Sequence, residues 1–512
     1  MAFAITQTCC NDATCVSVCP VNCIRPTPEE QAFGSTEMLH IDPETCIDCG
    51  ACADACPVDA VFPVDSLPAG QQEYAAMNAA YFERTEAEGE AEAQDTGDGS
   101  GPNFHPWGEP VFDRVLPSDF GPLRVAIVGT GPAGMYAAQD LLLHTRAEVT
   151  LIDRLPTAGG LIRYGVAPDH PATKKIGDTF ARFLTHPRVR LHLGLDVGRD
   201  ITPEELAAHH DAVVYAVGAA ADRRLGIPGE DRVGSLSATD FVAWYNGHPD
   251  VAPDAVDLST ERVVVVGNGN VALDVARLLV SDPETLTGTE IARYALAELR
   301  RSKVREVVLL GRRGPDDAAY TRPELLALKH LPEVDLVVDD HDPRVGAVVD
   351  GSRPNGKAAV LRDVAREAVD WSVPPDASGR RRIVLRFLST PLELCGDADL
   401  RAVRATGGDG ELLIPAGLAL RAIGYRGVPQ TGLPYDEATG TVPHERGRVT
   451  GTAGAYVVGW IKRGPSGGIG ANRVCAAETV GTLLADAVAG ALPAPTAGTK
   501  RFHRLARRRS HR

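Results

Sequence analysis

Short apolar runs bounded by glycine or charged residues recur after residue 120, and their spacing predicts the elements of the chain. Arg124-Val-Ala-Ile-Val128 and Glu148-Val-Thr-Leu-Ile152 are continuous apolar runs, as expected for strands buried on both faces of a parallel sheet. An alanine-rich segment from Met135 to about Leu143 lies between them and has the length of a helix. The pattern predicts a strand, a helix and a second strand in one βαβ unit.

The turn between this first strand and the helix has G-x-G-x-x-G spacing. Its glycines, Gly129, Gly131 and Gly134, allow a tight turn and a close approach of a pyrophosphate to the helix N-terminus. Asp153 follows the second strand, where an acidic side chain binds the ribose 2′-hydroxyl of a dinucleotide. The unit therefore predicts a dinucleotide-binding site.

A second copy of the pattern begins at Arg262-Val-Val-Val-Val266, with Ala272 in the position of the third glycine. Its second strand, Glu306-Val-Val-Leu-Leu310, ends in Gly311-Arg312-Arg313 where the first copy has an acid. Arginines at this point suit a 2′-phosphate. We therefore expect FAD in the first unit and NADPH in the second; the alternative is two arginines on an exposed loop.

The first sixty residues follow a different pattern, in which cysteines recur at short intervals. One run has C-x2-C-x2-C-x3-C spacing followed by Pro57, and consists of Cys46, Cys49, Cys52 and Cys56. An earlier half-copy, followed by Pro20, consists of Cys9, Cys15 and Cys19. Such runs wrap a loop around an iron–sulfur cluster, whereas zinc sites use two separated C-x2-C pairs. The spacing predicts iron–sulfur clusters.

In two-cluster ferredoxins the fourth cysteine of each run binds the other cluster. This crossing predicts one complete set of thiolates, formed by Cys19, Cys46, Cys49 and Cys52. The second set has only Cys9, Cys15 and Cys56, because Asp12 stands where the repeat predicts a cysteine. Three alternatives stay open: a three-iron cluster, a cluster held by the weaker carboxylate ligand of Asp12, or Cys10 as the fourth ligand. Cys23 has no ligand position and is predicted to be a buried free thiol.

The net charge of −16 comes from the first quarter of the chain. Residues 1–120 hold 21 acidic and three basic side chains, whereas residues 121–512 hold 47 and 49. We expect either an acidic front module that docks on a basic patch of the remainder or of a partner, or simply a solvated surface.

Two segments have the composition of connecting or terminal chain. Residues 85–120 are rich in Glu, Asp, Gly, Ser and Ala, and are predicted to be an acidic flexible linker. Residues 491–512 form a basic tail with Arg507-Arg508-Arg509 in a row, for which we expect a disordered charged segment.

The chain of 512 residues is long enough for two to four domains. No apolar run reaches the ~20 residues of a membrane span, and the N-terminus has no pattern of a secretory signal. Nine of the eleven cysteines belong to the iron–sulfur segment, and thiolate clusters fit a reducing compartment. We expect a cytoplasmic protein with no nucleic-acid partner.

From about residue 121 to 490 the sequence resembles the adrenodoxin-reductase type of ferredoxin–NADP reductase. The matching stretches are Gly129-Thr-Gly-Pro-Ala-Gly134, Arg163-Tyr-Gly-Val-Ala-Pro-Asp-His170, Gly267-Asn-Gly-Asn-Val-Ala-Leu-Asp274, Gly311-Arg-Arg-Gly-Pro315 and Tyr456-Val-Val-Gly-Trp-Ile-Lys-Arg-Gly-Pro-Ser-Gly-Gly-Ile-Gly470. The front segment resembles bacterial seven- or eight-iron ferredoxins, with Asp12 as its departure from the eight-iron pattern. The whole chain is thus similar to a ferredoxin fused to a ferredoxin–NADP reductase.

The resemblance implies the cofactor contacts. FAD would contact Gly129, Gly131, Ala133, Gly134, Asp153, Leu161, Val197, Trp460, Gly467, Gly468 and Ile469. NADP would contact Asn268, Gly269, Asn270, Val271, Arg312, Arg313, Glu324 and Gly467. Asp169 and His170 are candidates for handling a flavin proton, with a structural Asp-His pair as the alternative.

The order of these patterns predicts an α/β flavoprotein with two Rossmann-like dinucleotide-binding domains, preceded by a small α+β two-cluster ferredoxin domain. We expect a ferredoxin domain over residues 1–84 and an NADP-binding domain over 223–425. The NADP-binding domain would be inserted in a discontinuous FAD-binding domain over 121–222 and 426–490.

These cofactors predict an NADPH-dependent oxidoreductase. NADPH would give a hydride to FAD, and single electrons would pass to one [4Fe-4S] cluster and a second, [3Fe-4S] or [4Fe-4S], cluster. An external acceptor protein, such as a cytochrome P450-type or other ferredoxin-dependent enzyme, would receive them. The alternatives are an electron-input subunit like the small subunit of glutamate synthase, or a non-catalytic electron carrier.

Overall fold

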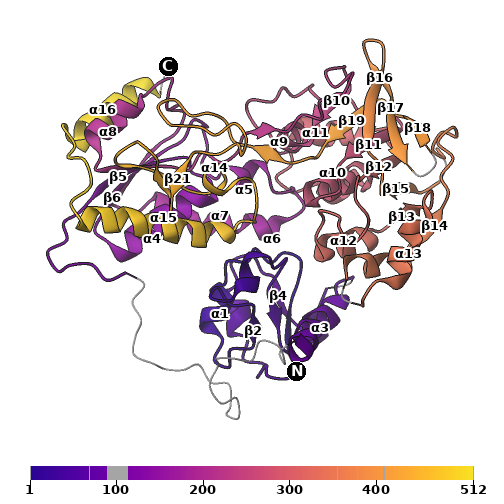
Figure 1. Cartoon of the computed structure of the whole chain (residues 1–512), viewed down its shortest axis with the longest axis horizontal. Helices are drawn as coiled ribbons and strands as arrows, with labels where there is room; N and C mark the ends of the chain where they lie inside the picture. The colour runs from indigo at the N-terminus through magenta and orange to yellow at the C-terminus, as the bar shows by residue number, and fades with distance from the viewer. Residues whose placement is uncertain are drawn as a thin grey trace.

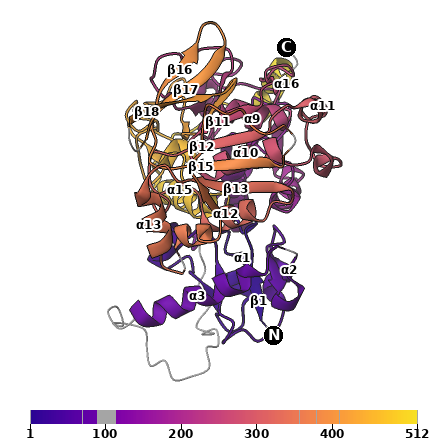
Figure 2. The ribbon, with the colours of Figure 1, turned by 90° about the vertical axis from the view of Figure 1, so that its right-hand side faces the viewer.

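The computed structural model describes residues 2–68, 70–88, 114–354, 356–377, 379–407 and 410–510. Two lobes lie side by side, and a small N-terminal domain lies beneath their junction (Figures 1 and 2). None of the helices in these ranges combines the length and apolar character needed to cross a bilayer. Most of the predicted linker, residues 89–113, lies outside the described residues.

The N-terminal domain is a small α+β unit. Its elements are β1 (Phe3–Ile5), α1 (Thr14–Val18), β2 (Ile24–Arg25), η1 (Gln31–Gly34), β3 (His40–Ile41), α2 (Ala51–Ala55), β4 (Val61–Pro63), η2 (Val64–Ser66) and α3 (Glu73–Glu88). β1 pairs with β4 and β2 pairs with β3, both antiparallel. Asn78 on α3 binds both pairs, because its Oδ1 accepts the N–H groups of Ile5 at 3.1 Å and Ile41 at 2.8 Å.

The first lobe is built on a seven-stranded sheet in the order β21-β22-β23-β8-β5-β6-β7. Its elements before the second lobe are β5 (Arg124–Val128), α4 (Pro132–His144), β6 (Glu148–Ile152), α5 (Leu161–Tyr164), α6 (Pro171–Lys174), α7 (Ile176–Leu184), β7 (Val189–His192), α8 (Pro203–His209) and β8 (Ala212–Tyr215). Those after it are β21 (His444–Glu445), β22 (Arg448–Val449), β23 (Ala455–Val457), α14 (Trp460–Arg463), α15 (Ala471–Val488) and α16 (Thr499–Arg509). β5 and β6 occupy the two predicted runs, and α15 packs on α4.

The second lobe has a parallel sheet in the order β10-β19-β11-β12-β15-β13-β14. Its strands are β10 (Ser235–Ser237), β11 (Arg262–Val266), β12 (Glu306–Leu310), β13 (Val334–Asp339), β14 (Ala365–Glu367), β15 (Arg381–Arg386) and β19 (Leu418–Arg421). The helices are α9 (Ala238–Tyr245), α10 (Asn270–Val280), η3 (Pro283–Leu286), α11 (Arg293–Arg301), α12 (Arg322–Lys329), α13 (Pro343–Gly351) and η4 (Lys357–Leu361). A separate antiparallel sheet comprises β16 (Pro391–Gly396), β17 (Leu400–Gly407) and β18 (Gly410–Pro415).

A two-stranded ribbon joins the lobes. β9 (Ala221–Asp222) pairs antiparallel with β20 (Tyr425–Arg426), so the chain enters and leaves the second lobe at one place. The second lobe therefore lies between residues 222 and 425 of the chain. The strands that flank it, β8 and β23, are parallel neighbours in the sheet of the first lobe.

The C-terminal segment is a helix, and the expectation of a disordered tail is wrong for the described residues up to 510. Phe502 and Ala506, one turn apart on α16, are buried in a cluster with Leu206 of α8. Arg509 pairs with Glu205 at 2.7 Å. Leu505 also packs against this cluster, so an apolar side of the helix faces the first lobe while Arg507 and Arg508 are exposed.

The expectation of a flexible linker is also wrong at both of its described ends. Residues 85–88 continue α3. Arg114 binds Asp140 of α4 at 2.5 Å and the carbonyl of Ala477 at 2.7 Å, and Phe120 packs against the apolar core. These contacts arise because apolar and basic residues follow the acidic stretch and pack on the first lobe. The segment that connects the two parts is therefore shorter than predicted.

The acidic N-terminal domain docks on the two lobes, as one of the two charge-based alternatives predicted. Asp59 pairs with Lys175 of the first lobe. Glu37 pairs with Lys357 of the second lobe at 3.0 Å, and Glu73 bonds His330 at 3.0 Å. The Tyr74 hydroxyl also donates a hydrogen bond to the carbonyl of Pro323 on α12 at 3.0 Å.

Candidate functional site

A cavity of about 1820 Å³ extends from one lobe to the other. Both glycine loops, the segment around Trp460 and the loop of the N-terminal domain that carries Cys9 and Cys10 line it. A pocket for one small ligand is usually about 300–1,000 Å³. The cavity therefore has room for two nucleotide cofactors.

On the first-lobe side, two glycines of the G-x-G-x-x-G loop have no space for a side chain. Gly129 has φ +105°, and a Cβ there would lie 2.4 Å from the carbonyl oxygen of Ala216. A Cβ on Gly134 would lie 2.1 Å from the Gly129 oxygen, so this glycine sets the packing of α4 on β5 and does not line the cavity. Gly131, at the N-cap of α4, is free to approach a phosphate.

Asp153, at the end of β6, is buried and organises the same loop. Its Oδ2 accepts hydrogen bonds from the backbone N–H of Thr130 at 2.8 Å and the Thr130 hydroxyl at 2.5 Å. Its Oδ1 accepts from the N–H of Leu155 at 2.9 Å. A carboxylate accepts about four hydrogen bonds, so the side chain retains capacity for a ribose hydroxyl.

The segment after β23 returns over the first glycine loop. Gly459 has φ +79°, and a Cβ there would lie 2.5 Å from the Ala133 side chain. The indole of Trp460 donates hydrogen bonds to the carbonyls of Ser466 at 3.1 Å and Gly467 at 3.3 Å, which fixes the ring against the following loop. Leu161, Val197, Gly468 and Ile469 line the same side, so the structure brings the predicted FAD contacts together, apart from Gly134.

The second-lobe loop repeats the arrangement of the first. Gly267 has φ +120°, and a Cβ there would lie 2.3 Å from the carbonyl oxygen of Ala422. Asn270 binds Thr321, because its Oδ1 accepts the Thr321 N–H at 2.8 Å. The buried Nδ2 of Asn268 has no hydrogen-bond partner in the described part of the chain. An unpaired buried amide donor beside a glycine loop fits a nucleotide that supplies the acceptor.

Arg312 and Arg313 follow β12 and are exposed at the cavity wall. Neither side chain makes an ion pair with another described residue, so both charges are available to a 2′-phosphate. Glu324, in the first turn of α12, also lines the cavity, together with Asn268, Gly269, Asn270 and Val271. The predicted NADP contacts of the second lobe therefore line one cavity, and the remaining one, Gly467, lines it from the loop after Trp460.

The two proton-handling candidates differ in position. His170 lines the cavity, whereas Asp169 does not and forms an ion pair with the buried Arg277. Arg277 also bonds Asp274 at 2.7 Å. Asp169 of the first lobe thus forms a structural ion pair with Arg277 on α10 of the second lobe.

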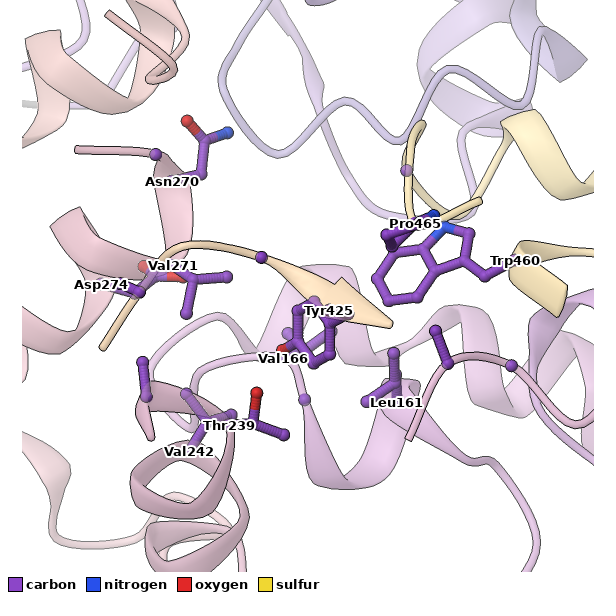
Figure 3. A pocket seen from close by; sticks show the side chains of 18 of the residues that line it. Leu161, Val166, Thr239, Val242, Asn270, Val271, Asp274, Tyr425, Trp460 and Pro465 are labelled. Atoms are coloured by element: carbon purple, nitrogen blue, oxygen red, sulfur yellow. The ribbon is translucent and has the colours of Figure 1, made fainter. Parts of the chain in front are cut away.

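Sequence reasoning missed the middle of the cavity. Figure 3 shows Tyr425 between Trp460 on one side and Val271 and Asp274 on the other. The Tyr425 and Trp460 rings are 5.1 Å apart, and burial raises the pKa of Tyr425, so the phenol stays neutral. The sequence could have indicated this position, because Tyr425 follows the carboxyl end of the parallel strand β19, and ligands bind at this end of the strands in sheets of this type.

The cysteines of the complete set meet around one small void. We call Cys19, Cys46, Cys49 and Cys52 the outer site; they line the void with Phe3, Val21, Cys23, Ile47 and Gly50. Burial raises the pKa of Cys52 to about 12, whereas a hydrogen bond from Cys23 lowers that of Cys19 to about 6. Four thiols with ferredoxin spacing around one void fit an iron–sulfur cluster, which binds their deprotonated form, and Cys23 adds a fifth thiol 3.4 Å from Cys19. Cys23 is buried and unbridged, as predicted.

The second set forms what we call the inner site, consisting of Cys9, Asp12, Cys15 and Cys56. Burial raises the pKa of Cys9 to about 11, and the negative charges of Cys56 and Asp12 add to the shift. The same neighbours and burial raise the pKa of Cys15. Cys9, Cys15 and Cys56 are thus close enough for their charges to interact, as expected of three ligands of one cluster.

The fourth corner of the inner site has two candidates. The Asp12 carboxylate accepts hydrogen bonds from the N–H and hydroxyl of Thr14, at the start of α1. Cys10 is buried next to Asp12, Cys9 and Cys56, whose charges together with burial raise its pKa. Across the interface, the buried hydroxyl of Tyr136 on α4 has no partner among the described residues, and Cys10 and Asp12 are among the groups that raise its pKa.

Comparison with known proteins extends over both parts of the chain. Residues 8–60 match the 4Fe-4S dicluster domain, and residues 123–292 match the pyridine nucleotide-disulphide oxidoreductase family. A probable ferredoxin/ferredoxin–NADP reductase of Mycobacterium tuberculosis is 46% identical over 510 residues, which cover 97% of this chain and 86% of that protein. The chain belongs to the ferredoxin/ferredoxin–NADP reductase family.

Within this family the reductase part also has a solved relative. The structure of Mycobacterium tuberculosis FprA in complex with NADPH matches with a TM-score of 0.68 and 40% identity, and covers 76% of this chain and 90% of FprA. The mitochondrial NADPH:adrenodoxin oxidoreductase of Arabidopsis thaliana is 39% identical over 424 residues, 76% of this chain and 87% of that protein. The predicted fold class, with two Rossmann-like lobes after a ferredoxin domain, is confirmed.

Proposed function

We propose that this chain is an NADPH-dependent FAD oxidoreductase that carries its own ferredoxin and delivers electrons to an external acceptor protein. The observation that carries the proposal is the shared cavity. It is lined by a glycine loop with Asp153 beside it, by a second glycine loop with Arg312 and Arg313 beside it, and by the loop that carries Cys9. Its family membership supports the same activity. When bound, FAD accepts a hydride from NADPH and gives up its electrons singly.

We assign the binding of each nucleotide to one lobe. Gly131 at the start of α4 and Asp153 would hold the pyrophosphate and ribose of FAD, and the loop that begins at Trp460 would cover the flavin. Arg312 and Arg313 would bind the 2′-phosphate of NADPH. The domain limits follow from this assignment: 121–222 with 426–490 for FAD, and 223–425 for NADP.

The residues between the two nucleotide sites position the reacting rings and keep water away. Tyr425 and Trp460 form an aromatic wall, and Val166 and Leu161 add apolar surface. His170 is the titratable side chain we propose for proton exchange, because Asp169 is held by Arg277. We propose a cytoplasmic location, where thiolate clusters are stable, and an acceptor of the cytochrome P450 type or another ferredoxin-dependent enzyme.

The test is steady-state oxidation of NADPH by the full-length holoprotein, with ferricyanide and with cytochrome c as acceptors. We expect turnover with both, a preference for NADPH over NADH, and bleaching of flavin and iron–sulfur absorption when NADPH is added without oxygen. Binding of NADPH without any reduction of the flavin would identify the chain as a carrier or scaffold and reject the proposal.

A further inference from the structure

We infer that the two iron–sulfur sites act in a fixed order, in which the inner site takes electrons from the flavin and the outer site passes them to the acceptor. The inference rests on the proposed function and adds the direction of flow through the N-terminal domain. It follows from how this domain is docked, because only one of its two sites faces the cavity.

The inner site is joined to the loop that covers the predicted flavin position. The backbone N–H of Gly470 donates a hydrogen bond to the carbonyl of Cys10 at 2.8 Å. A Cβ on Gly470 would lie 2.2 Å from the carbonyl carbon of Asn11, so the two loops are in backbone contact. Cys9 and Cys10 line the same cavity as Trp460. The inner site is thus within one loop of the cavity that would hold FAD.

Two further side chains of the first lobe lie against the loop that carries the inner site. Arg473 on α15 donates a hydrogen bond from its Nη1 to the carbonyl of Asp12 at 2.8 Å. The buried hydroxyl of Tyr136, which has no hydrogen-bond partner in the part of the chain that the structure describes, comes from α4, the helix that starts at the first glycine loop. The inner site therefore lies between the nucleotide fold and the remainder of the N-terminal domain.

The outer site is turned to solvent. None of its four cysteines lines the cavity. Cys49 is exposed, and the neighbouring Ile47 has 58% of its surface exposed. Glu44, Asp48 and Asp54 are exposed around it, and none of them makes an ion pair with a described residue of the two lobes.

The acidic side chains that bind the lobes are Glu37, Asp59 and Glu73. The charge of the N-terminal domain is therefore divided between a docked face and a face around the outer site. An exposed apolar side chain with an acidic rim suits a redox partner with a basic face. Electrons balance when one NADPH gives NADP⁺, H⁺ and two electrons, which reduce two molecules of a one-electron acceptor.

The order is tested in the full-length holoprotein by rapid-freeze EPR after mixing with NADPH under argon. One variant, Cys9→Ala/Cys15→Ala, removes the inner cluster, and a second, Cys46→Ala/Cys49→Ala, removes the outer cluster. Iron content and reduction by dithionite establish that the other cluster is present in each. Flavin bleaching by NADPH is recorded in all samples and tests the proposed function separately.

We expect the inner signal to precede the outer one in the unaltered protein. Without the inner cluster, NADPH should bleach the flavin but leave the outer cluster oxidised, although dithionite reduces it. Without the outer cluster, NADPH should still reduce the inner cluster, while cytochrome c reduction is lost. Reduction of the outer cluster by NADPH at the unaltered rate in the first variant would overturn the order.

If the double-cysteine variants lose both clusters, the order can still be tested with a substitution that changes none of the cluster ligands. Gly470 has φ −64°, which valine tolerates, so Gly470→Val disturbs the contact with Cys10 and Asn11 without straining its own backbone. We expect it to slow cluster reduction by NADPH but not flavin reduction. Gly351→Val is the matched control, because nothing lies within 4 Å of its added Cβ. Equal cluster reduction in both valine variants would contradict the inference.

Discussion

The carboxylate of Glu37 in the N-terminal domain accepts a hydrogen bond from the backbone N–H of Arg322, the first residue of α12, at 2.8 Å. Thr321, at the N-cap of this helix, makes no cap with its own side chain. The other oxygen of Glu37 pairs with Lys357 at 3.0 Å. The ferredoxin part therefore supplies the missing cap of the helix that carries Glu324, one of the proposed NADP contacts.

Glu37→Ala should weaken coenzyme binding even though Glu37 lies in the ferredoxin part. Loss of a helix cap costs about 1 kcal/mol, which corresponds to about a fivefold increase in KM for NADPH if α12 shifts accordingly. KM is measured with ferricyanide, which does not need the clusters. Glu44→Ala, an exposed acid of the same domain with no ion pair to the described lobes, is the control. Equal KM values in the two variants would show that the cap does not affect the coenzyme site.

Replacing both Arg312 and Arg313 by Gln should raise KM for NADPH far more than KM for NADH. A hydrogen bond to a charged group contributes about 1.5–3 kcal/mol, so each arginine is expected to contribute about tenfold to a hundredfold. The matched control replaces Arg507 and Arg508, an adjacent exposed pair on α16. If both coenzymes are affected alike, these arginines do not bind the 2′-phosphate.

The fourth corner of the inner site is decided by two variants. Asp12→Cys should convert the inner cluster to a four-iron cubane, seen as loss of a three-iron EPR signal and a gain of iron. Cys10→Ser should leave the cluster unchanged if Asp12 or an empty corner is native, and should lower its iron content if Cys10 is the ligand. Two all-cysteine four-iron clusters in the unaltered protein, unaffected by Cys10→Ser, would show that the crossing assignment is wrong.

The docking of the N-terminal domain should depend on salt when the covalent connection is removed. Residues 1–88 and 114–512, produced separately, should transfer electrons to cytochrome c when mixed. The rate should fall with ionic strength, because exposed ion pairs such as Lys175–Asp59 are screened over about 8 Å at physiological salt. In the intact chain the connection keeps the effective concentration high, near the millimolar range for short linkers. A C-terminal piece that reduces cytochrome c alone at the intact rate would exclude the ferredoxin from the electron path.

The histidines around the C-terminal helix should lower the free energy of unfolding in acid. Burial lowers the pKa of His192 and of His210 from the ordinary 6.5 to about 4, and His192 also bonds His503 of α16 at 3.0 Å. Both imidazoles stay neutral in the folded protein at a pH where the unfolded chain already binds a proton. The free energy of unfolding therefore falls as the pH drops from about 6.5 towards 4, by at most about 3 kcal/mol per histidine. Thermal unfolding of His192→Gln should depend less on pH in this window than that of the unaltered protein, with His186→Gln as control. An unchanged pH dependence would contradict the assignment.

The strands of both nucleotide folds were predictable because a buried parallel strand has a distinctive apolar run. β5, β6, β11 and β12 have the predicted bounds, and each glycine loop follows its strand. Sequence spacing likewise predicted that Cys19, Cys46, Cys49 and Cys52 meet, although it did not place Cys23 beside them. In these places local sequence and tertiary structure agree.

Other features depend on contacts between distant segments, which a local pattern does not encode. Phe502, Leu505 and Ala506 hold α16 on the first lobe, and three apolar residues among arginines resemble a solvated tail. The docked face of the ferredoxin depends on Glu37 and Glu73 finding Lys357 and His330, which are 320 and 257 positions further along the chain. The position of Tyr425 between the nucleotide sites similarly requires the return of the chain through β20.

The N-terminal domain is bonded to Gly470 on one side of the β9–β20 ribbon and to Arg322 on the other. Any swing of the second lobe about this ribbon changes the separation of those two anchors, so it must stretch or break one set of bonds. Docking of the N-terminal domain and opening of the two lobes are therefore coupled, and the coupling is reciprocal.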